Sequence, residues 1–246
     1  MIKIITLITQ FIVIALIALL FGSCNHFANI NSITGSGNVT TEKRTVQGDF
    51  KSVSVSNAID LVIEQSDKSE IFVEADDNLQ KEITTTVENG VLVISCKSSD
   101  FINVSSKKVT VKMPVIEELE AESAASINSK SVLKGNSLSL ISSSAASIHA
   151  DVAYEIIKIT SSSASDQTIQ GKALRLETTA TSASDIDASK LLVNEVIAKS
   201  SSASSIQVHP IVSLKAKASS GGDIIYDGTP KSVKKEEYSG GNIDQN

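Results

Sequence analysis

The sequence predicts an all-β protein whose main body is a parallel β-helix, a single-stranded solenoid with coils of about 20 residues. A short tract rich in serine and alanine recurs at nearly regular intervals through the second half of the 246 residues. Runs of alternating apolar and polar residues, typical of half-buried strands, separate the copies. Aromatic residues make up only 4% of the chain, which suits a narrow core filled by aliphatic side chains.

The repeated tract sets the length of the coil. Ser123-Ala-Ala-Ser-Ile127 is the first of six copies, which follow one another at intervals of 18 to 21 residues. Helical repeats would show a 3.6-residue period, leucine-rich repeats an L-x-x-L-x-L frame, and propeller blades a period of roughly 40–45 residues. None of these patterns is present. One short coil of strands cannot bury its own apolar face, so neighbouring coils must stack.

Stacking predicts that equivalent side chains form columns along the solenoid axis, about 4.8 Å apart. The first position of the tract is always serine, and we expect these hydroxyls to form a ladder from coil to coil. The second position is always small and is expected to face inward at a tight corner: Ala124, Ala145, Ala164, Ala183, Ala203 and Gly221. The fifth position is expected to be a core column with one polar interruption: Ile127, Ile148, Gln167, Ile186, Ile206 and Ile224.

The first half of the chain shares the strand pattern but lacks the tract. Alternating runs span residues 50–65, 70–76, 82–96 and 107–114. Asn89-Gly90 between two such runs predicts a tight hairpin. We expect these strands to begin the solenoid or to cap it, since an open end would expose strand edges. One continuous domain over residues 49–230 is favoured over a division at Pro114.

The first 23 residues are typical of a bacterial lipoprotein signal peptide. A short basic start precedes an almost wholly apolar run, residues 4–21, and small residues lead directly to Cys24. Cys24 is then the lipidation site, and the chain is attached to the membrane through its lipid. The alternative is an N-terminal membrane anchor, because the run is nearly long enough to span. Residues 24–48 are predicted to be a tether and residues 231–246 a C-terminal tail.

Two aspartates are the only candidate cation ligands. Asp166 and Asp185 occupy the same tract position on adjacent coils, where they are expected to lie close together. Ca²⁺ prefers such oxygen ligands. The favoured interpretation is nonetheless a pair of solvated turn aspartates, because the glycine-rich calcium repeats of other β-helices are missing. Cys96 and the scattered histidines, His26, His149 and His209, predict no metal site, and Cys96 is expected to be a buried, inert thiol.

Acidic clusters raise the alternative of a carbohydrate-active enzyme, since glycosidases use paired carboxylates. The chain contains only two arginines and no tryptophan to grip a sugar. Three of the glutamates also share one parity, which favours a solvated strand face. No catalytic residue is therefore predicted. The acidic residues concerned are Glu74, Asp76, Asp77, Glu117, Glu118, Glu120 and Glu122.

The chain resembles the family of putative auto-transporter adhesins with a head GIN domain, found mainly in Bacteroidetes. The resemblance rests on residues 35–65, 73–95, 123–224 and 226–243. It implies a right-handed β-helix and a lipoprotein of the cell envelope, on either face of the outer membrane. It brings no catalytic residues and no cofactor.

We therefore expect a noncatalytic, adhesin-like surface that binds an envelope protein or a glycan. The alternatives are the enzyme considered above and a passive stalk that only spaces other envelope components. A net charge of −6 and a pI near 5.2 argue against nucleic acid as a partner.

Overall fold

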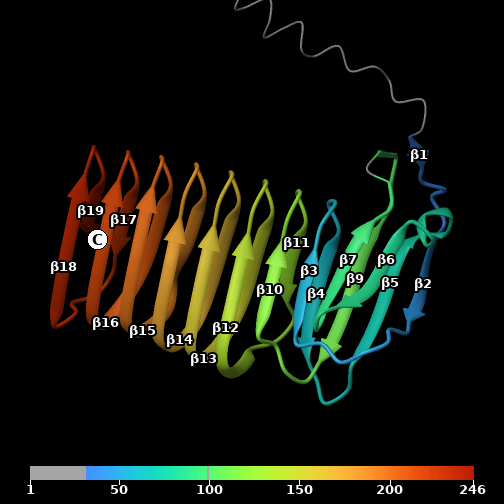
Figure 1. The fold of residues 1–246 in the computed structure, drawn as a ribbon, viewed down its shortest axis with the longest axis horizontal. Helices are drawn as coiled ribbons and strands as arrows, with labels where there is room; N and C mark the ends of the chain where they lie inside the picture. Colours follow the sequence, from blue (N-terminus) through green and yellow to red (C-terminus); the bar gives the residue numbers. More distant parts are fainter. Residues whose placement is uncertain (1–31, 99) are drawn as a thin grey trace, which may run out of the picture.

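Each coil consists of two short strands that face each other across an apolar core. The computed structural model describes residues 32–98 and 100–246, so the predicted signal peptide, Cys24 and His26 lie outside the described residues. Figure 1 shows the coils stacked side by side along the long axis, with tight turns along one edge and rounded bends along the other. We call these the turn edge and the bend edge. In the described part of the chain, no helix has the length and hydrophobicity needed to cross a membrane.

The prediction of a parallel β-solenoid is confirmed, with about seven turns at a spacing of about 19 residues. The ladders between successive coils of the second half are all parallel. The strands of this half are β10 (Glu118–Ala121), β11 (Ser126–Ser129), β12 (Leu133–Ser142), β13 (Ser147–Ser161), β14 (Asp166–Ala180), β15 (Asp185–Ser201), β16 (Ser205–Ser219), β17 (Asp223–Tyr226), β18 (Ser232–Tyr238) and β19 (Asn242–Gln245).

The long strands β13 to β16 each turn a corner at the bend edge. Alternation of buried and exposed residues breaks there, because two successive residues are both exposed, as at Glu155 and Ile156 in β13. The half of each strand before the corner belongs to one sheet, and the half after it belongs to the other. We call the sheet that contains β10 and β18 sheet 1, and the sheet that contains β11 and β19 sheet 2.

The isoleucines of the tract stand in register in sheet 2. Ile127 pairs with Ile148, and Ile186 pairs with Ile206, which in turn pairs with Ile224. Gln167 fills the gap between Ile148 and Ile186. The column continues beyond the tracts to Leu61, Val109 and Ile243, and all of its members are buried. This row packs against the inward residues of sheet 1 and forms the centre of the core.

The first half supplies both coils and a cap, in an order that differs from the order of the chain. The coil of β3 and β4 pairs with β10 and β11 on one side and with β7 and β9 on the other. After the coil of β3 and β4, the chain therefore forms the outer coil of β7 and β9. It then returns to the other side of β3 and β4 and continues the solenoid at β10. The elements are β1 (Ile33–Thr34), β2 (Val39–Arg44), β3 (Ser52–Val55), β4 (Asp60–Gln65), β5 (Glu70–Asp76), a 3-10 turn (Asp77–Leu79), β6 (Ile83–Glu88), β7 (Val91–Cys96), β8 (Phe101–Ile102) and β9 (Lys107–Met113).

Antiparallel strands close the N-terminal end. β5 pairs with both β2 and β9, and β6 pairs with β7 through the predicted hairpin, in which Asn89 and Gly90 both have positive φ. The prediction of a tether over residues 24–48 is wrong for its described part, because residues 39–44 form β2. A tether has no apolar face to bury, but β2 lies along the edge of β5 and satisfies its backbone groups.

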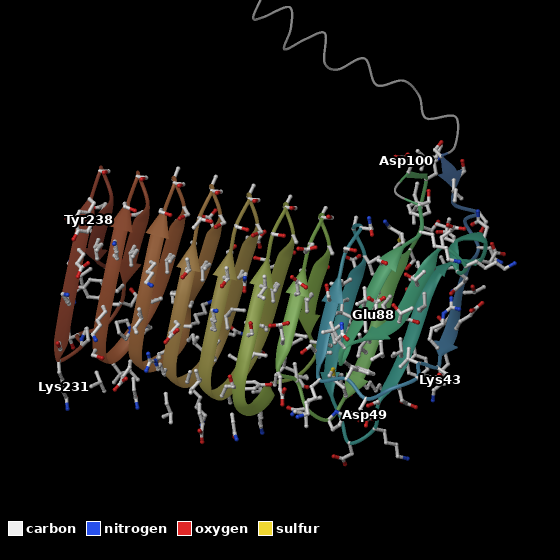
Figure 2. All side chains as sticks on the ribbon, in the orientation of Figure 1. Lys43, Asp49, Glu88, Asp100, Lys231 and Tyr238 are labelled. Carbon is white, nitrogen blue, oxygen red and sulfur yellow. The ribbon has the colours of Figure 1, made fainter. Side chains whose placement is uncertain are left out.

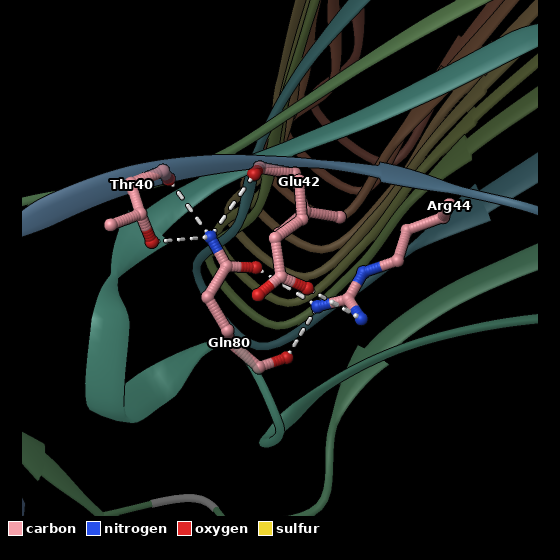
Figure 3. Close-up of polar contacts among 5 residues, drawn as sticks. Thr40, Glu42, Arg44 and Gln80 are labelled. Atoms are coloured by element: carbon pink, nitrogen blue, oxygen red, sulfur yellow. Dashed lines mark hydrogen bonds and ion pairs between the residues drawn. The ribbon is translucent and has the colours of Figure 1, made fainter.

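Two polar clusters fix the N-terminal segment to the cap. The fully buried carboxylate of Asp76 accepts hydrogen bonds from the backbone N–H groups of Gly37 (2.7 Å) and Ser105 (2.8 Å). Gln80 donates to the carbonyl of Thr40 (2.8 Å) and accepts from Arg44 (2.9 Å), as Figure 3 shows. The two clusters join residues 29 to 40 positions apart in the chain and so hold the N-terminal segment against the cap.

The C-terminal end is a further coil. Residues 231–246 were expected to be a tail, but β18 and β19 pair in parallel with β16 and β17. In Figure 2, Lys231 lies at the bend edge and Tyr238 near the turn edge, at opposite ends of β18. Lys235 and Glu237 occupy positions that are alanine in the preceding coil, Ala216 and Ala218, and they point over the end of the core. Charges at inward positions discourage another chain from pairing with this edge.

Candidate functional site

The Ser-Ala tract forms the turn edge. Ser123 and Ala124 both have positive φ, at 52° and 61°, and together they make a two-residue turn with both central residues left-handed. The same pair of positive angles recurs in every later copy. The alanines of the second position are exposed, so the expectation that they face inward is wrong. They are small because a larger side chain is strained in the left-handed region, not because the core limits their size.

Backbone hydrogen bonds hold these turns in line. The N–H of Ala124 donates to the carbonyl of Ser144 on the next coil (3.0 Å), and the N–H of Ala183 donates to the carbonyl of Ser202 (3.0 Å). The serines of the first position thus contribute their backbone carbonyls to the ladder, rather than the side-chain hydroxyls that the sequence analysis expected. The repeated bond offsets the cost of two left-handed residues per coil.

A ladder of buried serine hydroxyls lies one position inside the turn. Ser165, Ser184 and Ser204 are each at most 2% exposed. Each hydroxyl accepts the N–H of the residue three positions earlier at 3.1 Å and donates to a carbonyl of the preceding coil. The inward small column therefore exists at the third position of the tract, with the members Ala125, Ala146, Ser165, Ser184, Ser204 and Gly222.

Gln167 belongs to a buried polar network rather than to a ligand site. Its amide nitrogen donates to the hydroxyl of Ser142 (2.9 Å) and to the carbonyl of Thr160 (2.8 Å). The hydroxyls of Ser142, Ser161 and Ser165 lie within 3.0 Å of one another. This network links three serines and Gln167 at the corner from inside.

Asp166 and Asp185 are register partners on adjacent coils, and both are exposed. Within residues 32–98 and 100–246, no group of three or more His, Cys, Asp or Glu side chains could hold a metal ion. The arrangement is that of two solvated carboxylates at the start of strands in sheet 2.

The other acidic candidates are engaged in structural contacts. Asp77 accepts hydrogen bonds from the side chains of Ser36 and Asn38, and Glu74 accepts one from Ser106. Glu117 pairs with Lys51 at 2.9 Å. On β10, Glu118 and Glu120 point outward from sheet 1, in register with serines of β3. These carboxylates do not converge on a common cleft.

Cys96 and the described histidines also lie apart. Cys96 is half-buried rather than buried, and desolvation raises the pKa of its thiol despite the nearby Lys107. His149 is exposed on sheet 2, whereas the Nδ1 of His209 lies 3.3 Å from the carbonyl of Ser189. No serine hydroxyl is brought to either ring by a hydrogen bond in the described part of the chain.

The outer face of sheet 1 carries a group of lysines that the sequence analysis did not single out. Lys199 and Lys217 are register partners on β15 and β16, and Lys215 and Lys234 are register partners on β16 and β18. Lys158 lies on the same face of β13. We call these five exposed residues the lysine face. Three shallow depressions of about 280, 150 and 260 Å³ run over it, and all three include Lys199.

The bend edge carries the largest exposed apolar side chains. Ile156, Leu174, Leu192 and Ile211 are each 46–55% exposed. Leu174, Leu192 and Ile211 line a depression of about 460 Å³ whose lining also includes the buried Tyr154. Burial raises the pKa of Tyr154 to about 12, so its hydroxyl stays a donor to the carbonyl of Ile116 (3.0 Å).

Another depression, of about 550 Å³, lies where the cap meets the first coil. Two of its lysines are already paired, Lys43 with Glu70 at 2.7 Å and Lys51 with Glu117 at 2.9 Å. The lysine face is therefore the strongest candidate for recognition of a charged ligand.

Comparison with known proteins places these features in context. A family model described as "Putative auto-transporter adhesin, head GIN domain" matches residues 49–230, the bounds predicted for the β-helix. No curated protein matches the sequence.

Solved structures share the architecture. A "putative adhesin" from Bacteroides fragilis superposes with a TM-score of 0.78 at 19% identity, covering 87% of this chain and 100% of its own. A "putative adhesin" from Parabacteroides merdae gives 0.72 at 22% identity, covering 87% and 99%. A "putative lipid binding protein" from Parabacteroides distasonis gives 0.72 at 20% identity, with the same coverage. At these identities the likeness establishes the fold alone.

Proposed function

Because the chain belongs to the family described as "Putative auto-transporter adhesin, head GIN domain", we propose that it is a noncatalytic lipoprotein of the cell envelope that presents a rigid, adhesin-like binding surface. Lipid attached to Cys24 would anchor it in the outer membrane. Its partner on this proposal is a glycan or another envelope protein.

The observation that carries the proposal is the fixed register of outward side chains. On sheet 1, residues such as Ile197 and Lys215 stand directly beside each other on successive strands, and the ladder continues without a break along β15 and β16 from Glu195 to Ser201. Because pairing already fixes the backbone of these strands, little backbone freedom is lost on binding, which favours recognition of an extended partner. A passive stalk would have no need of the charged group gathered on one face.

The lack of converging acid groups supports the noncatalytic part of the proposal. Hydrolysis of a glycosidic bond requires two carboxyl groups on opposite sides of a sugar. Asp76 is sealed in backbone hydrogen bonds, and Asp166 and Asp185 lie beside each other on an exposed surface.

A binding screen of the full-length chain in detergent tests the proposal. We expect specific binding to at least one glycan or envelope protein, and no release of reducing ends from any polysaccharide that binds. Absence of binding to every glycan and envelope protein, with and without Ca²⁺, would favour the passive stalk. Release of sugar would favour the enzyme.

A second experiment tests the anchor. Cells that express the chain are labelled with a radioactive or clickable fatty acid, and the label is expected on the wild type but not on Cys24→Ala. The variant is also expected to leave the membrane fraction. Continued tight membrane association without label would show that the apolar run of residues 4–21 is itself the anchor.

A further inference from the structure

We propose that the lysine face of sheet 1 binds an extended anionic polysaccharide, with Lys199, Lys215 and Lys217 as its central contacts. The inference rests on the proposed function, because it names the face and the ligand chemistry of that binding surface. It depends on four observations: the register of the lysines, their lack of acidic partners, the continuous groove and the neighbouring hydroxyl groups.

The register brings like charges together. Lys199 and Lys217 are direct partners in a parallel ladder whose strands lie about 4.8 Å apart. Like charges directly opposite each other on a sheet are unfavourable. Lys215 lies two residues from Lys217 on the same face of β16, so three positive charges occupy one small area. An anion bound between them would relieve this repulsion.

Glu236 is the register partner of Lys217 and Glu177 that of Lys158, but neither carboxylate forms an ion pair with these lysines. The two carboxylates on this part of the face are already paired, Glu177 with Arg175 and Glu236 with Lys234, each at 2.7 Å. In the described residues, no carboxylate comes within ion-pair distance of Lys158, Lys199, Lys215 or Lys217. These lysines therefore form a positive area on a chain whose net charge is −6.

The shape of the face fits a linear chain. All three depressions include Lys199, one pair of them shares Ile197 and another pair shares Lys217, so they adjoin along one shallow groove across β13, β14, β15, β16 and β18. The groove crosses the strands and follows the stacking direction of the coils. The distance between neighbouring strands is comparable with the length of one hexose in an extended polysaccharide, so successive acidic sugars can meet successive coils.

Hydroxyl groups accompany the lysines. Thr179, Ser201 and Ser219 line the same depression as Lys199 and Lys217. Side-chain hydroxyls both donate and accept hydrogen bonds, which suits the hydroxyl groups of sugars. The face has few aromatic rings on which bases could stack, since Tyr238 already lies against Lys217. This composition favours an acidic glycan over single-stranded nucleic acid.

Binding of the full-length chain in detergent to polygalacturonate and to dextran sulfate, with uncharged dextran as reference, tests the proposal. The test variant is Lys199→Gln/Lys217→Gln. The matched control is Lys68→Gln/Lys81→Gln, which removes two exposed lysines from the N-terminal half and changes the net charge equally. Thermal melting of both variants confirms that they remain folded.

We expect the wild type to bind at least one anionic polymer, with an affinity that falls as salt rises. The test variant should lose about tenfold in affinity and the control less than about twofold. Equal losses in the two variants, or no binding of the wild type to either polyanion at low salt, would overturn the proposal. Binding only to single-stranded DNA or only to phosphatidylglycerol vesicles would also overturn it, in favour of those partners. The proposed adhesin function would survive each of these failures if a neutral glycan or an envelope protein bound elsewhere.

Discussion

The hydroxyl of Ser184 donates a 2.8 Å hydrogen bond to the carbonyl of Ser161, which belongs to the preceding coil. The same hydroxyl accepts the N–H of Thr181 at 3.1 Å and so closes its own turn. One buried oxygen therefore fixes the geometry of a turn and joins two coils. The exposed serine two positions earlier, Ser182, lies in the same turn with its side chain in solvent.

This contrast predicts different costs for two similar substitutions. Ser184→Ala removes one hydrogen bond from the N–H of Thr181 and one from the carbonyl of Ser161, which remain bonded to each other at 3.0 Å, and should lower the free energy of unfolding by about 0.5–1.5 kcal/mol. Ser182→Ala should change it by less than about 0.5 kcal/mol. Denaturant unfolding followed by circular dichroism measures both. Similar losses in the two variants would show that the hydroxyl does not hold the corner.

The left-handed turn predicts an unusual preference at the second tract position. Ala183 has a φ of 59° and is exposed, so Ala183→Gly removes a Cβ penalty and should leave stability unchanged or raise it by up to about 1 kcal/mol. Ala183→Val should lower stability by about 1–2 kcal/mol, because a β-branched residue is strained there. The control is Ala188→Gly in a buried strand position, which should be destabilising. Loss of stability in Ala183→Gly would contradict the assignment of the turn.

Close packing between coils makes one glycine essential. A Cβ at Gly171 would lie 2.0 Å from the carbonyl oxygen of Val152 on the neighbouring strand, at a φ of +123°. At Gly90 a Cβ would meet nothing within 4 Å, so only the conformational cost of φ +81° remains. We expect Gly171→Ala to lower the free energy of unfolding by about 1–3 kcal/mol more than Gly90→Ala does. Equal effects would mean that the strands can separate without cost.

Asp76 predicts a pH dependence of the cap. Burial opposes ionisation of this carboxyl, but the N–H groups of Ser105, Gly37 and Ser106 outweigh it and hold its pKa below the ordinary 3.8. A carboxyl whose folded pKa is lowered contributes stability above its unfolded pKa and loses it as the pH falls through the folded value. Asp76→Asn should therefore be destabilising at neutral pH.

The difference between wild type and Asp76→Asn should shrink as the pH falls below about 4. Thermal melting from pH 7 to pH 2.5 measures it. Asp49→Asn is a suitable control, because Asp49 is exposed on the loop before the first coil. A constant difference between wild type and Asp76→Asn across this range would show that the charge of Asp76 is not what holds the segment.

The charged residues at the C-terminal end of the solenoid are expected to prevent its association with other copies of the chain. Lys235→Val/Glu237→Val would extend the apolar inward columns to the open edge of β18 and should cause concentration-dependent association. Lys234→Val/Glu236→Val alters the same strand and the same residue types on its outward face, and serves as the control. Sedimentation velocity distinguishes them, and association of the control to the same extent would argue against end-to-end stacking.

Periodicity in the sequence was sufficient to predict the solenoid and the isoleucine column, but the solenoid continues beyond the predicted end at residue 230, into β18 and β19. Prediction from periodicity failed where residues adopt the left-handed backbone conformation, with positive φ. An alanine that recurs at one position indicates a small space or a left-handed turn, and sequence alone cannot separate the two. The last coil could have been found, because Tyr238-Ser-Gly-Gly-Asn-Ile243 repeats Ser219-Ser-Gly-Gly-Asp-Ile224 after 19 residues.

The candidate binding face was harder to predict than the fold. In the linear sequence, Lys199, Lys215 and Lys217 do not indicate a binding site, because alternating lysines on a strand usually indicate a solvated face. Only the register between β15 and β16 shows that they adjoin. The order of the N-terminal coils could not be predicted either. β3 pairs with β7 and with β10, and no local sequence pattern indicates these pairings.

Because the bend and the turn repeat from coil to coil, coils can be added to the solenoid or removed from it. Because the coils of β13 to β16 begin and end at equivalent points, duplication or deletion of one such unit of about 19 residues would add or remove about 4.8 Å of height. Evolution can thus adjust how far such a protein reaches from its point of attachment without inventing new packing. The number of units determines the length of the solenoid, and the residues that face solvent can change without changing that length.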